Sequence, residues 1–212
     1  ARAIRHGFPW VYADELVTDR RTQGLAPGAL AVLEDGERRP LGLVTINTRS
    51  KIIARMLDRD PEAVVDQAWF AARLSKAHAH RARLYDQPFY RLVHAESDGL
   101  PGLVVDRYGD TLVAQFGAAG VERWKDVIAD ALLELTGCPR LYERSDASSR
   151  ALEGLPEVTG WLRGDGPTAL ELQEHGWRLG LDIALGHKTG YYLDQRDSRL
   201  ALREYTKRLK FA

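Results

Sequence analysis

Alternating apolar and polar positions over the first sixty residues predict a small unit built from β-strands. Short runs rich in Leu, Val and Ile occupy residues 29–34, 41–46 and 52–57, and Asp35-Gly36 supplies a turn after the first run. No long helical pattern interrupts these runs. Residues 1–65 are therefore expected to form a small β-barrel or curled sheet.

The pattern changes to a helical period between residues 66 and 86. Phe70, Leu74, Ala77, Arg81 and Leu84 recur at helical spacing, which predicts an amphipathic helix. Its outward-facing positions are basic, namely Arg73, Lys76 and Arg83. Gln87-Pro88 ends the pattern, so residues 66–87 are interpreted as a connector helix between two domains.

Strand and helix patterns mix in residues 88–166, which predicts a small central α+β domain. Strands are expected at 90–94, 103–108, 111–116 and 141–144, a helix over 121–135, and a loop over the Gly- and Pro-rich residues 154–167. Residues 167–212 complete the α+β fold. There, 169–174 and 177–182 flank His175-Gly176 as a hairpin, and a final helix begins near Asp194. Capping of that helix by Asp194 and Asp197 is the structural alternative to a role in ligand contact.

Composition narrows the class of protein. The 212 residues carry 30 basic and 30 acidic side chains, so the chain as a whole is not an electrostatic binder of nucleic acid. The segment 186–212 is locally basic, with seven Lys or Arg against three Asp or Glu. A single cysteine, Cys138, fits a reducing compartment. No apolar run reaches the length of a membrane span, so we expect a cytoplasmic protein with no membrane partner.

Three clusters of residues admit both a functional and a structural interpretation. Residues 5–12 (RHGFPWVY) interleave bases with aromatics, which suits RNA contact by Arg5 and His6, while Trp10 is expected to pack. His94, Glu96 and Asp98 alternate as a metal or acid–base set would, yet Asp98-Gly99 also has the chemistry of a turn, and the structural interpretation is favoured. Cys138 and the Ser148-Ser149 pair are interpreted as structural.

Residues 186–196 (GHKTGYYLDQR) form the densest polar cluster, and they are followed by the last helix. The glycine spacing matches neither a phosphate-binding Walker loop nor a dinucleotide-binding fingerprint. Lys, Thr, Tyr, Asp, Gln and Arg together between a hairpin and a helix indicate ligand contact.

This segment resembles the G-x-K-T-G-x-F/Y-x-D-Q-R motif of the PUA-domain-containing, class I S-adenosylmethionine-dependent methyltransferases that make 5-methylcytosine in large-subunit ribosomal RNA. Residues 90–107 (YRLVHAESDGLPGLVVDR) resemble the central-domain signature of the same family. Residues 5–12 are similar to its R-x-x-H-P-W-V-F opening, except that Phe8 replaces the usual His.

The resemblance implies a PUA barrel, a central α+β domain and a Rossmann-like catalytic domain, with S-adenosylmethionine as cofactor and 23S ribosomal RNA as partner. Carried over residue by residue, it nominates one wall of the cofactor pocket: Lys188, Thr189, Tyr191, Asp194, Gln195 and Arg196. The predicted RNA-binding residues are Arg5, His6, Lys76 and Arg83.

The family's later V-L-D-x-F-x-x-x-G-G-F element and its nucleophilic Cys have no counterpart in these 212 residues. We therefore expect no catalytic residue and no metal ligand in the chain, most of the catalytic domain to be missing, and the chain alone to be inactive. Two alternatives stay open, a stand-alone RNA-binding module and a metal-dependent hydrolase using His94, Glu96 and Asp98. A homodimer is also left open.

Overall fold

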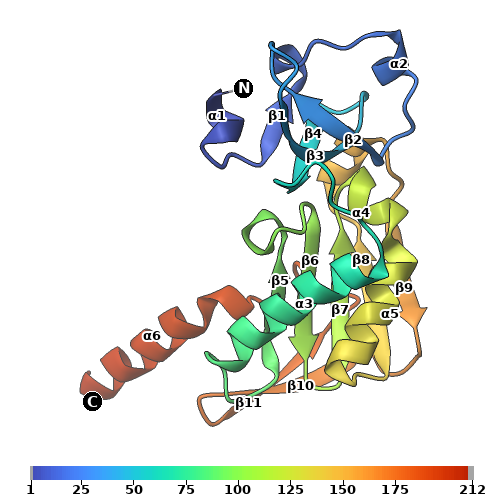
Figure 1. The fold of residues 1–212 in the computed structure, drawn as a ribbon. Helices are drawn as coiled ribbons and strands as arrows, with labels where there is room; N and C mark the ends of the chain where they lie inside the picture. The colour runs from blue at the N-terminus through green and yellow to red at the C-terminus, as the bar shows by residue number, and fades with distance from the viewer. Residues whose placement is uncertain (1, 210–212) are drawn as a thin grey trace.

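The computed structural model describes residues 2–209 as an N-terminal sheet, a central α+β unit, and a C-terminal hairpin with a helix (Figure 1). The N-terminal strands are antiparallel and lie in the order β1-β4-β3-β2. The elements of this unit are α1 (Arg2–Arg5), β1 (Trp10–Tyr12), η1 (Ala13–Glu15), α2 (Arg20–Gln23), β2 (Ala29–Glu34), β3 (Pro40–Ile46) and β4 (Ile52–Asp58). The strands predicted at 29–34, 41–46 and 52–57 are confirmed to within one residue at each end.

The predicted turn between β2 and β3 is stabilised by the side chain of Asp35. Its Oδ1 accepts the backbone N–H of Glu37 at 2.8 Å and that of Arg39 at 3.0 Å, which satisfies two donors that the turn leaves free. The strands then bury one apolar cluster, made of Ile4, Val11, Leu33, Val44, Ile46, Ile53, Ala54 and Met56.

Helix α3 (Gln67–Ala82) follows the N-terminal unit and begins where the sequence predicts. The carboxylate of Asp66 caps it by accepting the backbone N–H of Trp69 at 2.9 Å. The buried stripe ends at Ala77, and the helix ends at Ala82, so the expectation that Leu84 continues the stripe is wrong: Leu84 is 59% exposed. Because α3 packs against α5 and β5, it contributes to the core of the central unit as well as connecting to it.

The central unit is a five-stranded sheet in the order β5-β6-β7-β8-β9. Strands β7 and β8 are parallel and joined by helices, and the other pairs are antiparallel. Its elements are β5 (Phe89–His94), η2 (Ala95–Asp98), β6 (Leu103–Tyr108), β7 (Thr111–Phe116), α4 (Ala119–Arg123), α5 (Lys125–Thr136), β8 (Arg140–Ser145), η3 (Ser148–Glu153) and β9 (Val158–Arg163). The predicted helix over 121–135 is divided into α4 and α5 at Trp124.

Strand β9 lies inside the segment that the sequence predicts to be a loop, and that prediction is wrong. β9 is the edge strand of the central sheet and pairs antiparallel with β8. Gly160 interrupts the apolar pattern of this segment, so the local sequence shows no clear strand period. In the structure Gly160 has a φ of 141°. Pairing with β8, a tertiary contact, decides its conformation.

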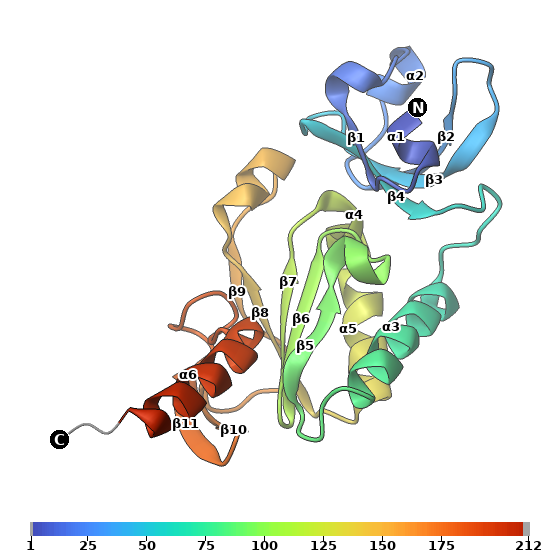
Figure 2. The same cartoon turned by 90° about the vertical axis from the view of Figure 1, so that its left-hand side faces the viewer.

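The central sheet is covered on both faces (Figure 2). Helices α3 and α5 pack on one face over an apolar cluster that includes Phe70, Leu74, Ile128 and Leu132. The other face is covered by the hairpin β10 (Ala169–Glu174) and β11 (Trp177–Asp182) and by the segment that follows it, which share a second cluster: Phe89, Tyr108, Val113, Tyr142, Leu172, Ile183 and Leu193. The hairpin occupies the same residues, 169–174 and 177–182, that the sequence predicts.

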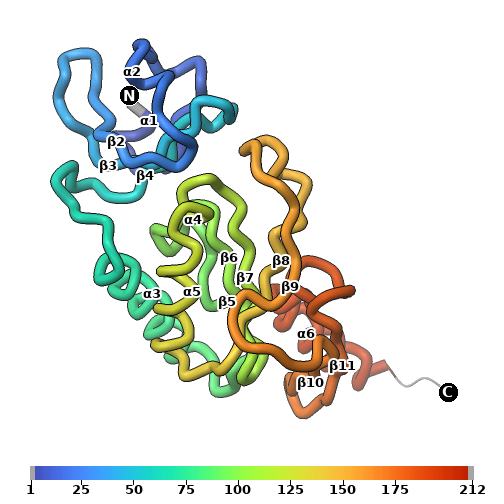
Figure 3. The backbone as a smooth tube through the Cα atoms, turned by 90° about the vertical axis from the view of Figure 1, so that its right-hand side faces the viewer, coloured from blue at the N-terminus to red at the C-terminus, as the bar shows by residue number. Residues whose placement is uncertain are grey.

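The N-terminal and central units meet at the β8–β9 connection, which rises toward the N-terminal sheet (Figure 3). The buried carboxylate of Glu153 accepts hydrogen bonds from Asn47 Nδ2 at 3.1 Å, Ser50 Oγ at 2.8 Å and Arg55 Nη2 at 2.9 Å. Gly28 completes the contact, because its φ is 80° and a Cβ there would collide with the carbonyl of Ala119. A polar cluster thus holds the two units together.

The chain ends in η4 (Leu193–Gln195) and α6 (Arg196–Arg208), which extends away from the central sheet (Figures 1 and 2). The predicted capping role of Asp194 is wrong. Gln195 occupies the N-cap position of α6, with no side-chain cap, and Asp194 binds Lys188 instead. Within residues 2–209, no helix is both long and apolar enough to cross a membrane.

Candidate functional site

The segment between β11 and α6 carries the polar motif and folds back tightly on itself. The Gly186 N–H donates to Asp182 O at 2.8 Å, and the Gly190 N–H donates to His187 O at 2.8 Å. A Cβ at Gly186 would collide with the carbonyls of Asp182 and Gly190, so only glycine fits there. Lys188 takes the left-handed region with a φ of 57°, which projects its side chain from the turn.

Thr189 fixes this segment to the central sheet. Its hydroxyl donates to the carboxylate of Asp106 and lies 3.1 Å from the hydroxyl of Tyr108. Asp106 is fully buried, and its two oxygens also accept from Arg91 Nε at 2.9 Å and Nη2 at 3.0 Å. Burial lowers the pKa of the Arg91 guanidinium, but its hydrogen bonds to Asp106 and the negative charge of that carboxylate outweigh burial and raise the pKa overall. Thr189 is itself fully buried, so its hydroxyl serves the fold.

Lys188 and Asp194 form the exposed part of the segment. Lys188 Nζ lies 3.1 Å from Asp194 Oδ2 and 4.4 Å from the centre of the Tyr192 ring. Burial raises the pKa of the Asp194 carboxyl, but the hydrogen bond and charge of Lys188 outweigh it and lower the pKa overall. An ammonium, a carboxylate and an aromatic ring are therefore presented together to solvent, a combination that suits a polar ligand carrying a heterocycle.

Arg196 and Arg199 tie the start of α6 to the rest of the molecule. Arg196 donates to the carbonyl of Phe89, and its guanidinium lies 4.6 Å from the centre of the Tyr85 ring. Arg199 makes two hydrogen bonds of 2.6 Å to the buried carboxylate of Glu174. Both arginines thereby orient the helix against the sheet and hairpin.

The six predicted cofactor residues are all in one segment, but they face different surroundings. Lys188, Asp194 and Gln195 are exposed, and Thr189 is buried. Arg196 is half-buried between Tyr85 and the sheet, and Tyr191 is half-buried beneath the guanidinium of Arg199, 4.5 Å from its ring centre. Burial and the charge of Glu174 raise the pKa of the Tyr191 hydroxyl.

A pocket of about 290 Å³ opens beside this segment, between α3, β5 and the start of α6. Its wall includes several side chains that sequence reasoning missed, namely His80, Tyr85, Tyr90 and Arg91. The Arg91–Asp106 pair could have been predicted from the sequence, because one basic and one acidic residue interrupt two otherwise apolar strands. In the structure the two residues are direct partners in the β5–β6 register. No sequence signal indicates that His80 and Tyr85 line the pocket, because only the packing of α3 against β5 brings them to its wall.

The four predicted RNA-binding residues are exposed on two different units. Arg5 ends α1 and pairs with Asp35, and His6 follows it. Lys76 lies on α3, and Arg83 caps its C-terminus about 10 Å further along the helix axis. Lys76 also lines a second pocket, of about 460 Å³, beside α3.

The alternating residues His94, Glu96 and Asp98 do not converge on a common point. Asp98 binds Arg81 through both oxygens at 2.6 and 2.7 Å, and Glu96 accepts from Trp10 Nε1 at 2.7 Å. The side chain of His94 lines the 290 Å³ pocket. The described part of the chain contains no group of three His, Cys, Asp or Glu placed to hold a metal. Because the chain turns into η2 after His94, the strand alternation on which the metal interpretation rested does not continue.

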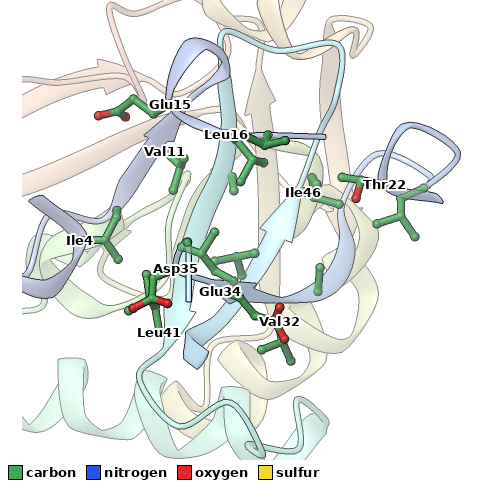
Figure 4. Close-up of a pocket in the computed structure, with 17 residues that line it drawn as sticks. Ile4, Val11, Glu15, Leu16, Thr22, Val32, Glu34, Asp35, Leu41 and Ile46 are labelled. Carbon is green, nitrogen blue, oxygen red and sulfur yellow. The ribbon is translucent and has the colours of Figure 1, made fainter. Parts of the chain in front are cut away.

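A further pocket, of about 490 Å³, lies within the N-terminal unit (Figure 4). Its 17 lining residues are mainly apolar, with three acidic side chains, Glu15, Glu34 and Asp35, and no basic one. A pocket with acidic groups and no cation disfavours phosphate. RNA contact by this unit would therefore involve a different surface.

The Glu174 contacts predict a pH-dependent docking of α6. Burial raises the pKa of Glu174, but the hydrogen bond of Arg199 and the charge of Arg196 outweigh it, and the pKa is lowered overall. The stabilisation is therefore complete above the ordinary pKa of glutamate and lost as the pH falls through the folded value. Amide exchange of α6, corrected for its intrinsic pH dependence, should accelerate on acidification. Glu174→Gln should exchange faster at neutral pH and respond less to acid, and an unchanged response would contradict the role of Glu174.

The fold is shared with solved methyltransferase structures. A Streptococcus mutans protein classed as S-adenosylmethionine-dependent superposes with a TM-score of 0.76 at 19% identity, over 95% of this chain and 51% of that chain. A second structure, classed as a methyltransferase and crystallised with S-adenosylhomocysteine (SAH), gives 0.77 at 18% identity, over 95% and 50%. Residues 1–59 match the family of PUA-like domains. The described fold therefore combines a PUA-like unit with an α/β arrangement found in methyltransferases.

Comparison with curated relatives indicates a narrower class of protein than the structural comparison does. Ribosomal RNA large subunit methyltransferase I of Shewanella denitrificans is 38% identical over 97% of this chain and 53% of its own length. The same enzyme of Cronobacter sakazakii is 39% identical over 96% and 52%. The chain is thus homologous to ribosomal RNA large subunit methyltransferase I and spans about half the length of the curated relatives it matches.

Proposed function

We propose that the chain is the N-terminal portion of an S-adenosylmethionine-dependent methyltransferase that makes 5-methylcytosine in 23S ribosomal RNA in the cytoplasm. The observation that carries the proposal is 38% identity to a ribosomal RNA large subunit methyltransferase over 97% of the chain. In this proposal, residues 1–65 and 66–87 contribute RNA binding, residues 88–166 form the central domain, and residues 167–212 lead into the catalytic domain.

The chemistry of the 186–196 segment fits one wall of a cofactor pocket. S-adenosylmethionine carries an adenine, a ribose with two hydroxyls, and an amino-acid group with both charges. Tyr192, the Asp194 carboxylate and the Lys188 ammonium offer a complementary ring, acceptor and cation on one exposed surface. When bound, the cofactor supplies the methyl group, and these side chains would bind and orient it. Thr189 and Arg196 would act by holding the segment in place.

No side chain of this chain is assigned the nucleophile. Methylation at cytosine C5 requires a thiolate that adds at C6. Cys138 is the single cysteine in the sequence, and it is 4% exposed within the core beside α5 and β8. We therefore propose that methyl transfer depends on the region of the relatives that this chain does not span.

The alternative of a stand-alone RNA-binding module makes a different prediction for the same segment. An RNA-only module has no need for the paired Lys188 and Asp194, whereas a cofactor wall does. The conformation of this segment, fixed by buried Thr189 while its polar groups face outward, favours the methyltransferase.

Methyl transfer from tritiated S-adenosylmethionine to 23S ribosomal RNA tests the proposal. The product of the intact reading frame should label a cytosine, and Lys188→Ala should lower kcat/KM by about tenfold through weaker cofactor binding. The 212-residue chain should bind the RNA and transfer no label. A matched Lys51→Ala variant, altered at an exposed lysine of the N-terminal unit, should keep its affinity for the cofactor. Labelling by the 212-residue chain alone would contradict the proposal that methyl transfer depends on the region of the relatives that this chain does not span.

A further inference from the structure

Two pockets beside α3 adjoin each other and connect the surface of that helix to the 186–196 segment. The larger, of about 460 Å³, is lined by Lys76 and the η2 region, and the smaller, of about 290 Å³, by β5 and the start of α6. His80 and Arg81 line both, so the two pockets share a wall. We call the combined feature the α3 groove. Figure 2 shows β5, an edge strand of the central sheet, between α3 and α6.

The α3 groove is lined by an excess of cations. Five Lys or Arg side chains line it against two carboxylates, those of Asp98 and Asp194. The arginines are held by ion pairs made by their own guanidinium nitrogens, since Arg91 binds Asp106 through Nε and Nη2 and Arg81 binds Asp98 through Nη1 and Nη2, which fixes the two groups. Lys76 has no carboxylate within ion-pairing distance among residues 2–209. Such a wall of ordered guanidiniums and one free ammonium suits the phosphates of a polynucleotide.

Apolar and aromatic surface lies at the mouth of the smaller pocket. Leu84 is 59% exposed, and Tyr85 beside it is 36% exposed. Tyr85 is held rigid because its ring stacks on Tyr90 with centres 5.3 Å apart and the Arg196 guanidinium lies over it at 4.6 Å, so Leu84 and the edge of the Tyr85 ring, not its faces, are the surface available to a base. A rigid apolar surface next to cations is the environment in which proteins hold an unpaired nucleobase.

We propose that the α3 groove holds single-stranded RNA. Phosphates lie along Lys76, His80 and Arg81, and one base lies against Leu84 and Tyr85. The inference rests on the proposed function and deepens it, because the groove ends at Asp194 and Arg196 of the cofactor segment. The base held at Leu84 is then a neighbour of the nucleotide that is methylated. A base can lie against Leu84 only when it is unpaired and unstacked, which requires a single strand and not a duplex.

Fluorescence anisotropy with a labelled single-stranded RNA from 23S ribosomal RNA tests the phosphate contacts. Lys76→Ala should weaken binding and reduce the slope of log Kd against log salt by about one. Arg123→Ala, at an exposed basic position of α4 that lines neither pocket, is the matched control and should leave the slope unchanged. A duplex of the same sequence should compete poorly. Equal effects of the two variants, or equal competition by the duplex, would overturn the proposal.

Photo-crosslinking tests the base contact separately. RNA carrying 4-thiouridine should crosslink to the peptide that contains residues 80–94, and Leu84→Ala should lower the yield about threefold or more. Crosslinks confined to residues 5–12 would place the RNA elsewhere and leave the proposed function standing. Failure of the wild-type chain to bind ribosomal RNA at all would instead overturn the proposed function together with the groove.

Discussion

Replacing Asp106 with alanine should lower the free energy of unfolding by about 3–5 kcal/mol, as expected when one partner of a buried ion pair is removed. Asp106 is fully buried and accepts hydrogen bonds from Arg91 and Thr189. Its loss leaves the Arg91 guanidinium without its counter-charge and the Thr189 hydroxyl without its acceptor. Urea unfolding measures the effect.

The same replacement should release the 186–196 segment before the whole domain unfolds. Amide exchange at residues 186–192 should accelerate more than exchange in β6 or β7, because Thr189 is the buried anchor of that segment. Asp194→Ala is the control, since its carboxylate is 54% exposed and its ion pair with Lys188 contributes at most about 1 kcal/mol. A cost for Asp106→Ala no greater than that for Asp194→Ala would contradict the anchoring role.

Glu153→Ala should separate the PUA-like unit from the central unit. The Glu153 carboxylate accepts hydrogen bonds from the side chains of Asn47, Ser50 and Arg55, which belong to the N-terminal unit. It also accepts the backbone N–H of Ala119, a residue of the central unit, at 3.3 Å. Removing it leaves several buried donors unsatisfied, at a cost of about 2–4 kcal/mol. We expect calorimetry to give one transition for the wild type and two for the variant, and proteases to cut the 59–66 linker faster in the variant.

A control variant and the pH dependence distinguish the role of this junction from a general loss of stability. Glu157→Ala removes an exposed carboxylate from the same connection and should change neither measurement. Burial raises the pKa of Glu153, but hydrogen bonds from Arg55 and Asn47 outweigh it and lower the pKa overall. The stabilising contribution of Glu153 to the junction is therefore complete above the ordinary pKa of glutamate and is lost as the pH falls through the pKa of Glu153 in the folded protein. A single transition in Glu153→Ala at every pH would refute the role of this carboxylate.

Elements whose signals are local were predictable. The strand β2, its Asp35 turn and the β10–β11 hairpin have apolar patterns and turn residues that lie within a few positions of one another. The N-terminus of α3 was equally predictable, because Asp66 caps it through a hydrogen bond only three residues away. These features need no distant part of the chain to form.

Features that depend on distant partners were missed or misinterpreted. β9 becomes a strand only because β8 offers it an edge, and Asp194 turned out to bind Lys188 instead of capping a helix. The sequence nominated Thr189 for the pocket wall but carried no signal that its hydroxyl binds Asp106, 83 residues earlier in the chain. A side chain's motif position gives its chemical type but not the direction in which it faces.

By itself, then, the sequence determined most of the strands and helices and the polar motif at 186–196, because periodicity and turn chemistry act over short separations, and its resemblance to a known family indicated the PUA-like opening. Only the tertiary structure decided which polar groups hold the fold and which face outward. That division depends on burial and on partners such as Arg91–Asp106 and Glu153–Arg55, which come from different strands and different units. The α3 groove has the same origin, since it joins residues of α3 to residues of α6 more than 100 positions away.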